Sequence, residues 1–226
     1  MSSQVKSKQR VADHGEVFTA EREVKAMCDL VADECLRIDS RFLEPACGDG
    51  NFLAEILKRK LTVVTKKYKK LAYDWERNSL LALGSLYGVD ILADNASVCR
   101  ERLFGIWDDE YKAVCKSECN DETRNSARCI LEHNIICGNA LTLMTVDENQ
   151  VDTEIPIVFS EWTFPFNDAM IHRKDYTMAE LLSASEHTNE FEKTGQLSLF
   201  ANEDGEAEPT FLKEYISHYR RICENE

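Results

Sequence analysis

Apolar residues along this chain recur with helical spacing in some stretches and form short runs in others. In residues 21–38 the apolar positions lie three or four residues apart, as on one face of a helix: Val24, Met27, Leu30, Val31, Cys35 and Ile38. The run 41–48, RFLEPACG, is a short apolar segment that leads into a Gly-rich turn, and residues 51–61, NFLAEILKRKL, return to helical spacing. This order predicts a helix followed by a strand–turn–helix unit.

The same alternation continues along the chain. Helical spacing over residues 68–87 ends at Gly88, where GVDIL predicts a second strand, and residues 93–106 are helical again. NIICGNALTL predicts a third strand with a turn, and IPIVFSEW predicts a fourth strand. Strands that alternate with helices indicate an α/β fold with a mostly parallel sheet and helices on both faces.

The polar stretches set the expected domain boundaries. Residues 1–13 predict a flexible tail, and residues 14–182 form one domain. Residues 183–210 are acidic with few apolar positions, which is typical of a linker or an exposed loop. Residues 211–226 predict a terminal helix, through apolar residues at Phe211, Leu212, Tyr215, Ile216 and Tyr219.

Composition is that of a globular protein. The chain has 226 residues, of which 43% are hydrophobic and 30% charged, enough for one sizeable core. No run of about 18 apolar residues occurs and the N-terminus is polar, so we expect a cytoplasmic protein without membrane contact. The nine cysteines are expected to be reduced, and the spacing of Cys115, Cys119, Cys129 and Cys137 lacks the paired knuckles of a zinc site, so no metal is predicted.

The net charge limits the partners that the chain can bind alone. At −14 the charge disfavours a broadly basic surface, and Lys and Arg contacts to phosphate dominate nucleic-acid affinity. Basic clusters at 58–60, 66–70 and 172–174 fit solvated surfaces. DNA binding is therefore expected to depend on a partner subunit.

The Gly-rich turn after the first strand is the candidate ligand site. Glycine is needed where backbone approaches a ligand closely, and Gly48 and Gly50 stand at the carboxyl end of a predicted strand. Asp90 ends the next strand, where a carboxylate accepts hydrogen bonds from a ribose. The third Gly of the dinucleotide fingerprint G-x-G-x-x-G is missing from CGDGNFL, which favours a smaller adenosine-type ligand with a sulfonium and an amino-acid end.

Four stretches of the chain resemble the S-adenosylmethionine-dependent adenine-N6 DNA methyltransferases, in the order of type I modification subunits and related restriction-modification enzymes. GEVFTAEREVKAMCDLV is similar to the family's F-T-P segment, with Ala20 in place of Pro. FLEPACGDGNFLAEIL is similar to its first motif, LYGVDILADNASVCRERL to its second, and IICGNALTL to its third. The resemblance implies a Rossmann-like methyltransferase fold over Gly15 to Leu143.

Residue roles follow from this resemblance. It implies cofactor contacts at Phe18, Thr19, Glu44, Ala46, Gly48, Gly50, Asp90, Ile91 and Asn139. Asp90 would bind the ribose hydroxyls, Ile91 would pack on the adenine, and Asn139 would contact its N6 edge. Taken singly, Asp90 also fits a helix cap and Asn139 a turn.

The family's catalytic N-P-P-Y motif has a divergent counterpart in SEWTFPFND. A polar side chain and a backbone carbonyl there accept hydrogen bonds from the target amine, and an aromatic ring stacks on the flipped base. Ser160, Glu161 and Trp162 are the candidate catalytic residues, although neither Pro is present; Thr163 to Phe166 keeps a Pro and an aromatic three residues later. The alternatives to an active methyltransferase are therefore an AdoMet-binding regulator without catalytic activity and an interaction protein.

A second short motif lies in the acidic segment. Gln196, Leu197, Ser198, Leu199 and Phe200 resemble the Q-L-x-L-F peptide by which bacterial proteins dock on the DNA sliding clamp. Apolar side chains in a flexible segment can fill a preformed groove on a partner. The alternative is that they pack back on the domain as a short strand or turn.

Overall fold

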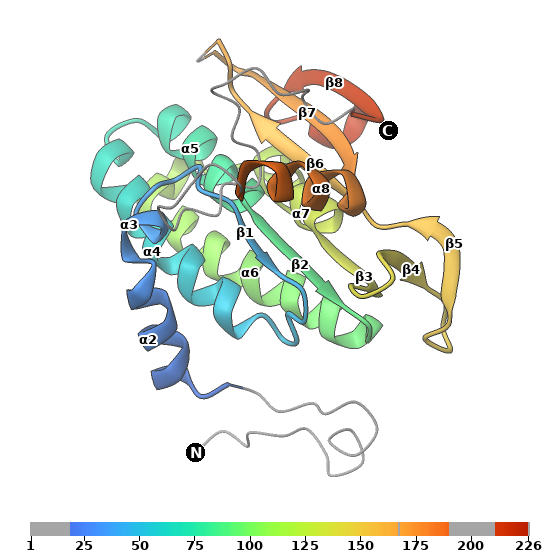
Figure 1. The fold of residues 1–226 in the computed structure, drawn as a ribbon. Coiled ribbons are helices and arrows are strands. Elements are labelled where there is room, and N and C mark those ends of the chain that lie inside the picture. The colour runs from blue at the N-terminus through green and yellow to red at the C-terminus, as the bar shows by residue number, and fades with distance from the viewer. Residues whose placement is uncertain (1–18, 167, 190–210, 226) are drawn as a thin grey trace.

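The computed structural model describes residues 19–166, 168–189 and 211–225, and these form a mixed α/β fold (Figure 1). One sheet has the strand order β1-β2-β3-β4-β5 and a second has the order β6-β7-β8. The strands of the first sheet are β1 (Phe42–Glu44), β2 (Leu86–Asp90), β3 (Ile135–Asn139), β4 (Met144–Val146) and β5 (Asp152–Pro156). Those of the second are β6 (Val158–Thr163), β7 (Met170–Thr177) and β8 (Lys213–His218). The predicted α/β class is confirmed.

The first sheet is mixed. β1 pairs in parallel with β2 and β2 with β3, whereas β4 and β5 are antiparallel to their neighbours. β2 is buried along its whole length, but β1 is only half-buried and pairs with β2 alone among the described strands. The carboxyl ends of the three parallel strands therefore meet at one end of the sheet, next to a free edge.

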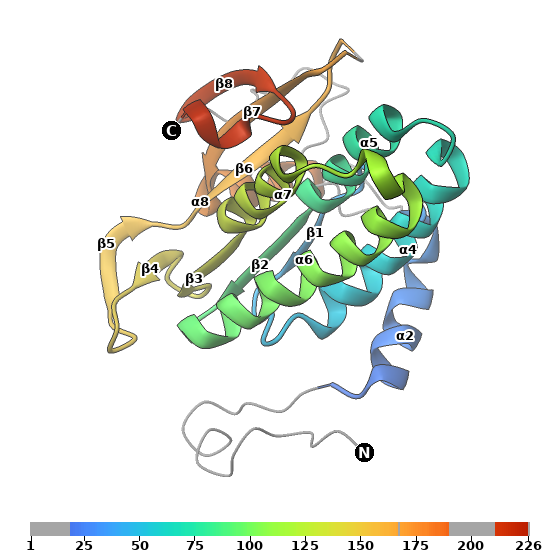
Figure 2. The same ribbon diagram turned by 180° about the vertical axis from the view of Figure 1, so that it is seen from behind.

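Helices cover the two faces of this sheet unequally. Their bounds are α2 (Glu21–Leu30), α3 (Ala32–Cys35), α4 (Asn51–Tyr68), α5 (Ala72–Gly84), α6 (Ala93–Cys115), η1 (Lys116–Glu118), α7 (Asp121–Asn134), α8 (Met178–Asn189) and η2 (Ile222–Asn225). Helices α4, α6 and α7 lie on one face and α8 on the other (Figure 2). The larger core is on the side of α4 to α7, where Trp75 stacks on Tyr111 at 5.5 Å.

The predicted fourth strand is wrong as a single element. IPIVFSEW is divided between β5 and β6, which belong to different sheets. Pro156 has no N–H to continue the ladder. The fully buried Ile157 donates its N–H to the Leu143 carbonyl at 2.9 Å and accepts the Met178 N–H at 2.8 Å. These two bonds turn the chain out of the first sheet and into the second.

The predicted terminal helix over 211–226 is also wrong, because residues 213–218 form strand β8 along β7. The apolar spacing fits a helix, but burial alternates as in a strand: Ser217 and Tyr219 are buried while Ile216 is half exposed. Pairing with β7 buries alternate residues of this segment, and this burial favours a strand over a helix.

Two other boundaries differ from the prediction. The helical stretch 68–87 divides into the end of α4 and helix α5, and Gly88 lies within β2, where a Cβ would approach Cys47 Sγ to 3.1 Å. Helix α8 runs through the predicted domain boundary at 182/183. The expected tail 1–13 and most of the expected linker 183–210 lie outside the described residues.

A buried carboxylate joins the second sheet to the helices. Glu76 of α5 is fully buried and accepts hydrogen bonds from the hydroxyls of Tyr111 and Tyr219, at 2.5 and 2.6 Å. It also accepts Asn120 Nδ2 at 3.0 Å and forms an ion pair with Arg220 at 2.7 Å. A buried charge persists where it is paired and hydrogen-bonded, and these partners supply both conditions. The segment that follows β8 is thereby fixed to α5.

A buried amine holds the approach to β1. Lys60 of α4 is fully buried, and its Nζ donates to the Ile38 carbonyl at 3.2 Å, to Ser85 Oγ at 2.6 Å and to the Ser40 carbonyl. Burial lowers the pKa of Lys60 to about 7. The three acceptors match the three protons of an ammonium group, so all three hydrogen bonds form only when Lys60 is protonated.

We predict that Lys60 makes stability rise with pH above neutrality. Because its pKa of about 7 lies below that of an unfolded lysine, the unfolded chain binds more protons between pH 7 and pH 10. The free energy of unfolding should therefore increase across this window relative to Lys60→Met, by about 1 kcal/mol per pH unit. Denaturant unfolding of both proteins at several pH values gives the difference between their free energies of unfolding. Because the other titrating groups are the same in both proteins, their contributions cancel in this difference. A difference that stays constant with pH would contradict the lowered pKa.

Candidate functional site

A cavity of about 620 Å³ opens at the carboxyl ends of the three parallel strands. Its walls come from the turn after β1, residues 44–52, from residues 90–95 after β2, and from residues 138–141 at the end of β3. Thr19, Val24 and Met27 close the side toward α2. Ligands of open α/β sheets bind in this position, so the fold places a candidate binding site where the sequence predicted one.

The Gly-rich turn has the backbone that only glycine adopts readily. Gly48 has φ of 53° and Gly50 has φ of 81°, and both lie in the left-handed region. Gly50 precedes the first residue of α4, and a Cβ there would lie 2.6 Å from Cys99 Sγ. The turn thus brings the N-terminus of α4 to the cavity, and its residue Gly50 packs against α6.

The Asp90 carboxylate connects two walls of the cavity through hydrogen bonds. Its Oδ2 accepts the Gly48 N–H at 2.9 Å, and its Oδ1 accepts the Leu92 N–H at 2.9 Å and Asn95 Nδ2 at 3.3 Å. A carboxylate has about four acceptor positions, so three internal bonds leave room for one donor from a ligand. Asp90 therefore combines a structural role, which holds the Gly48 turn and the start of α6, with a position on the cavity wall.

Two other predicted residues face the cavity with different degrees of constraint. Burial raises the pKa of the Glu44 carboxyl at the end of β1. Asn139 is held as in a turn, because its Oδ1 accepts the Leu141 N–H at 3.0 Å and its Nδ2 donates to Asp152 Oδ1 at 3.0 Å. Glu44 is thus the less engaged of the two polar groups.

The structure brings most of the predicted cofactor residues together. Those that line the cavity are Thr19, Glu44, Ala46, Gly48, Asp90, Ile91 and Asn139. Gly50 lies beneath the turn, buried and outside the lining. Phe18 lies outside the described residues, as does the clamp-like motif from Gln196 to Phe200.

Sequence reasoning missed several residues of the lining. Asn95, buried on the first turn of α6, donates to Asp90, and Phe52 of α4 contributes an aromatic ring to the wall. Asn51 and Asp49 stand beside the glycines in the turn itself. Asn95 could have been found from the sequence, because it is a polar residue on the first turn of a helix, close to the end of the preceding strand.

Most of the lining is apolar, and its charged side chains are acidic. It contains the carboxylates Glu44, Asp49 and Asp90, and no Lys or Arg stands among its described residues. Asp49 forms an ion pair with Arg102 at 3.2 Å, outside the lining. The positive ends of the α4 and α6 dipoles are the features of the described wall that favour an anion. The site therefore favours a ligand that carries positive charge over one that carries phosphates.

The predicted catalytic residues lie elsewhere, on β6. Ser160 is fully buried; its Oγ donates to Asp175 Oδ1 at 2.6 Å and accepts Arg173 Nε at 3.1 Å. Glu161 forms an ion pair with Arg41. Both side chains are engaged within the protein, and neither lines the cavity.

Trp162 is a core residue in this fold. It is 3% exposed and packs on Gly84 of α5, where a Cβ would come within 2.8 Å of Trp162 Cδ1. Its ring also lies 5.9 Å from that of His133, edge to face. A ring enclosed in this way has no free face for a flipped base, so the assignment of a stacking role to Trp162 is not supported by its position.

Comparisons of the chain with protein-family models, with curated proteins and with solved structures found no match. Within the described residues no group of three or more His, Cys, Asp or Glu could hold a metal ion, and no helix is long and apolar enough to cross a membrane. All nine cysteines are free thiols. The chemistry of the cavity itself therefore carries the functional argument.

We predict that Trp162 supports stability and not ligand binding. Trp162→Ala leaves a cavity beside Gly84, so the free energy of unfolding should fall by about 3–5 kcal/mol, measured by denaturant titration. Phe166→Ala is the matched control, because Phe166 is 72% exposed and its loss should change stability little. Equal stability of the two variants would show that Trp162 is not part of the core.

Proposed function

We propose that the chain binds S-adenosylmethionine in this cavity, with a Rossmann-like arrangement of β1, β2 and their turns. The observation that carries the proposal is the hydrogen bond from the Gly48 turn to Asp90, at a cavity whose described lining contains no Lys or Arg. A volume of about 620 Å³ falls in the range of small-ligand and cofactor sites. The resemblance of four sequence stretches to AdoMet-dependent methyltransferases agrees with this ligand.

Charge separates this ligand from other adenosine compounds. Nicotinamide dinucleotides and ATP carry phosphates, which sites commonly bind through Lys, Arg or a longer glycine loop. AdoMet carries a sulfonium and an ammonium group, and acidic lining residues favour both. The absence of Lys and Arg from the described lining therefore favours AdoMet.

The walls of the cavity suggest an orientation for the ligand. The N-terminus of α4 is suited to the carboxylate of the methionine part, because its first N–H groups have no partners within the helix. Glu44 is suited to the ammonium group, whose charge would lower the raised pKa of that carboxyl. Asp90 has one acceptor position left for a ribose hydroxyl.

We further propose that the chain is the cofactor-binding subunit of an adenine-N6 DNA methyltransferase. In that reaction the sulfonium methyl group passes to the amine, which loses a proton, and S-adenosylhomocysteine is left. The described lining holds no side chain positioned for a base, since Ser160, Glu161 and Trp162 lie on β6. A partner would therefore supply the acceptor side and the DNA contacts that a net charge of −14 opposes.

A regulator that binds AdoMet without catalysis is the second candidate. The observation that favours it is the burial of Ser160 and Trp162, which occupies the residues best placed by sequence for catalysis. The two candidates share the cofactor and differ in whether any partner restores methyl transfer.

We predict that the purified chain binds AdoMet and that ATP and NAD⁺ do not compete. Asp90→Asn should weaken binding about tenfold or more, since it removes charge and acceptors from the wall and loosens Gly48. Isothermal titration calorimetry measures the affinities, and thermal unfolding without ligand reports the stability of each variant. Asp109→Asn, whose parent side chain is 85% exposed on α6, is the matched control.

Two outcomes would overturn this assignment of the cofactor. One is an absence of binding at millimolar AdoMet by a chain that is folded. The other is binding of ATP as tight as that of AdoMet, which would show that the acidic lining does not select the ligand.

We also predict that the chain alone transfers no methyl group to DNA. The physical reason is that Ser160, Glu161 and Trp162, which were expected to hold the target amine and its base, lie on β6 and do not line the cavity. Tritiated-methyl transfer to mixed DNA, with and without the products of neighbouring genes, measures the activity. Turnover by the chain alone that is lost in Ser160→Ala would restore the catalytic role of Ser160.

A further inference from the structure

The free edge of β1 and the helices beside it form one exposed surface. Strands of parallel sheets are commonly buried on both faces and paired on both sides, as β2 is here. β1 is half-buried and pairs only with β2 among the described strands. Within the described part of the chain, the sheet therefore ends at the strand that carries the Gly-rich turn.

Backbone hydrogen bonds show which groups of β1 remain unpaired. Phe42 donates its N–H to the Ser85 carbonyl at 3.0 Å, toward β2. Because N–H and C=O groups alternate in direction along a strand, those of Leu43 point away from β2. No other described residue bonds to them. The next outward position is Pro45, which offers a carbonyl and no N–H, so an added strand would pair over a short length.

Exposed apolar side chains accompany this edge on α2 and α3. Within ten residues the chain exposes Met27, Leu30, Val31 and Leu36, and Leu30 is 86% exposed. Met27 also lines the cavity. Helices α2 and α3 lie at the β1 side of the sheet, far from β5, in both views (Figures 1 and 2). Four exposed apolar side chains so close in sequence are a candidate interaction surface.

The charges around the cluster identify the kind of partner. Exposed Glu23, Asp33 and Asp39 form no ion pair with another described residue. The whole chain has a net charge of −14. A second copy would bring like charge to this surface, whereas a basic polypeptide would be attracted to it.

We propose that a basic partner polypeptide docks here, adding a β-strand beside β1 and covering the apolar side chains of α2 and α3. Backbone pairing to Leu43 sets the register, and burial of Leu30 and Leu36 supplies most of the affinity. The partner then extends the wall of the cavity next to Met27. That this partner also reads DNA rests on the function proposed above; the docking surface itself does not.

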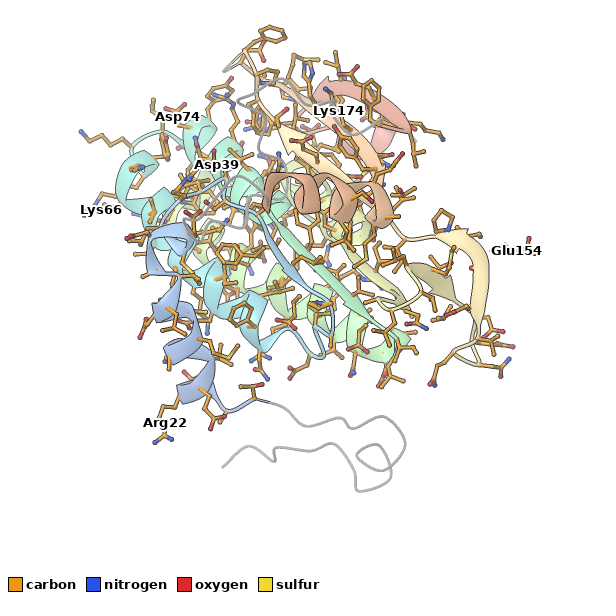
Figure 3. All side chains as sticks on the ribbon, viewed as in Figure 1. Arg22, Asp39, Lys66, Asp74, Glu154 and Lys174 are labelled. Carbon is orange, nitrogen blue, oxygen red and sulfur yellow. The ribbon has the colours of Figure 1, made fainter. Side chains whose placement is uncertain are left out.

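The first experiment identifies what touches the surface in the native cell. A photo-crosslinking amino acid is placed at Leu30 or at Leu36, and at Ile155 as a control, which is 64% exposed on β5. Figure 3 shows the same two sides of the molecule, with Arg22 on α2 and Glu154 on β5. The expected result is one adduct, with the same basic polypeptide, from the two α2–α3 positions and none from Ile155.

The second experiment tests the purified partner against the full chain. The double variant Leu30→Arg, Leu36→Arg should weaken its binding at least tenfold, by burying cations against a basic apolar surface. Val151→Arg, Ile155→Arg is the matched control and should bind as the unchanged chain does, since both parent residues are exposed on the other side of the molecule. Hydrogen exchange of the Leu43 amide should slow when the partner binds.

Each contrary result overturns the proposal. These results are adducts with a second copy of the chain, adducts only with its own residues 190–210, an acidic partner, no adduct at all, or equal binding by the two double variants. AdoMet binding by both double variants is measured in parallel. If a variant loses partner binding and still binds AdoMet, the docking surface is distinct from the cofactor site. If no protein binds AdoMet and docking is intact, the proposed function alone is wrong.

Discussion

The carboxylate of Asp90 is the constraint on which the cavity depends. It stands at the end of β2, the one fully buried strand of the parallel part of the sheet, so its position is fixed by the core. From there it accepts the Gly48 N–H of the first turn and the Leu92 N–H of the second. A charge at this depth requires several donors, and the backbone of two loops provides them. These bonds hold the two loops in a fixed position relative to each other, and so fix where the N-termini of α4 and α6 face the cavity.

A second buried carboxylate, Glu76, accounts for the distance between the cavity and the strand that was expected to carry catalysis. It holds Tyr219 and Arg220, which follow β8, against α5. The β6-β7-β8 sheet is thereby drawn toward α5 and α7, where Trp162 packs on Gly84. Ser160 then lies in the interior, bonded to Asp175, and cannot also reach a ligand at the ends of β1 and β2. The packing of the second sheet thus excludes β6 from the site.

How far the sequence predicts this structure depends on the range of the interactions involved. The strand–turn–helix unit at Gly48 and Gly50 is local, because positive φ and the following apolar helix are encoded within about ten residues, and it was predicted correctly. Asp90 was correctly placed at the end of a strand, but the sequence left its role open between a helix cap and a ligand contact, and its bonds to Leu92 and Asn95 were not predicted. The fate of β6 and β8 depended on pairing with β7 and on Glu76, more than 80 residues away from β6 along the chain, and periodicity carries no such information.

The edge position of β1 gives the cavity a particular physical character. A site between two central strands has protein on both sides, and burial there excludes water and strengthens each electrostatic contact. Here the turn that follows β1 has the sheet on one side and a free strand edge on the other. Such a site can hold a small cationic ligand through Glu44, Asp90 and the α4 N-terminus, which are all supplied by this chain. Among the described residues, only Thr19, Val24 and Met27 close this side, and the same edge presents the unpaired Leu43 backbone and the apolar side chains of α2 and α3. Under the proposed function, recognition of the cofactor therefore falls to this chain, and exclusion of water from the reacting amine falls to its partner.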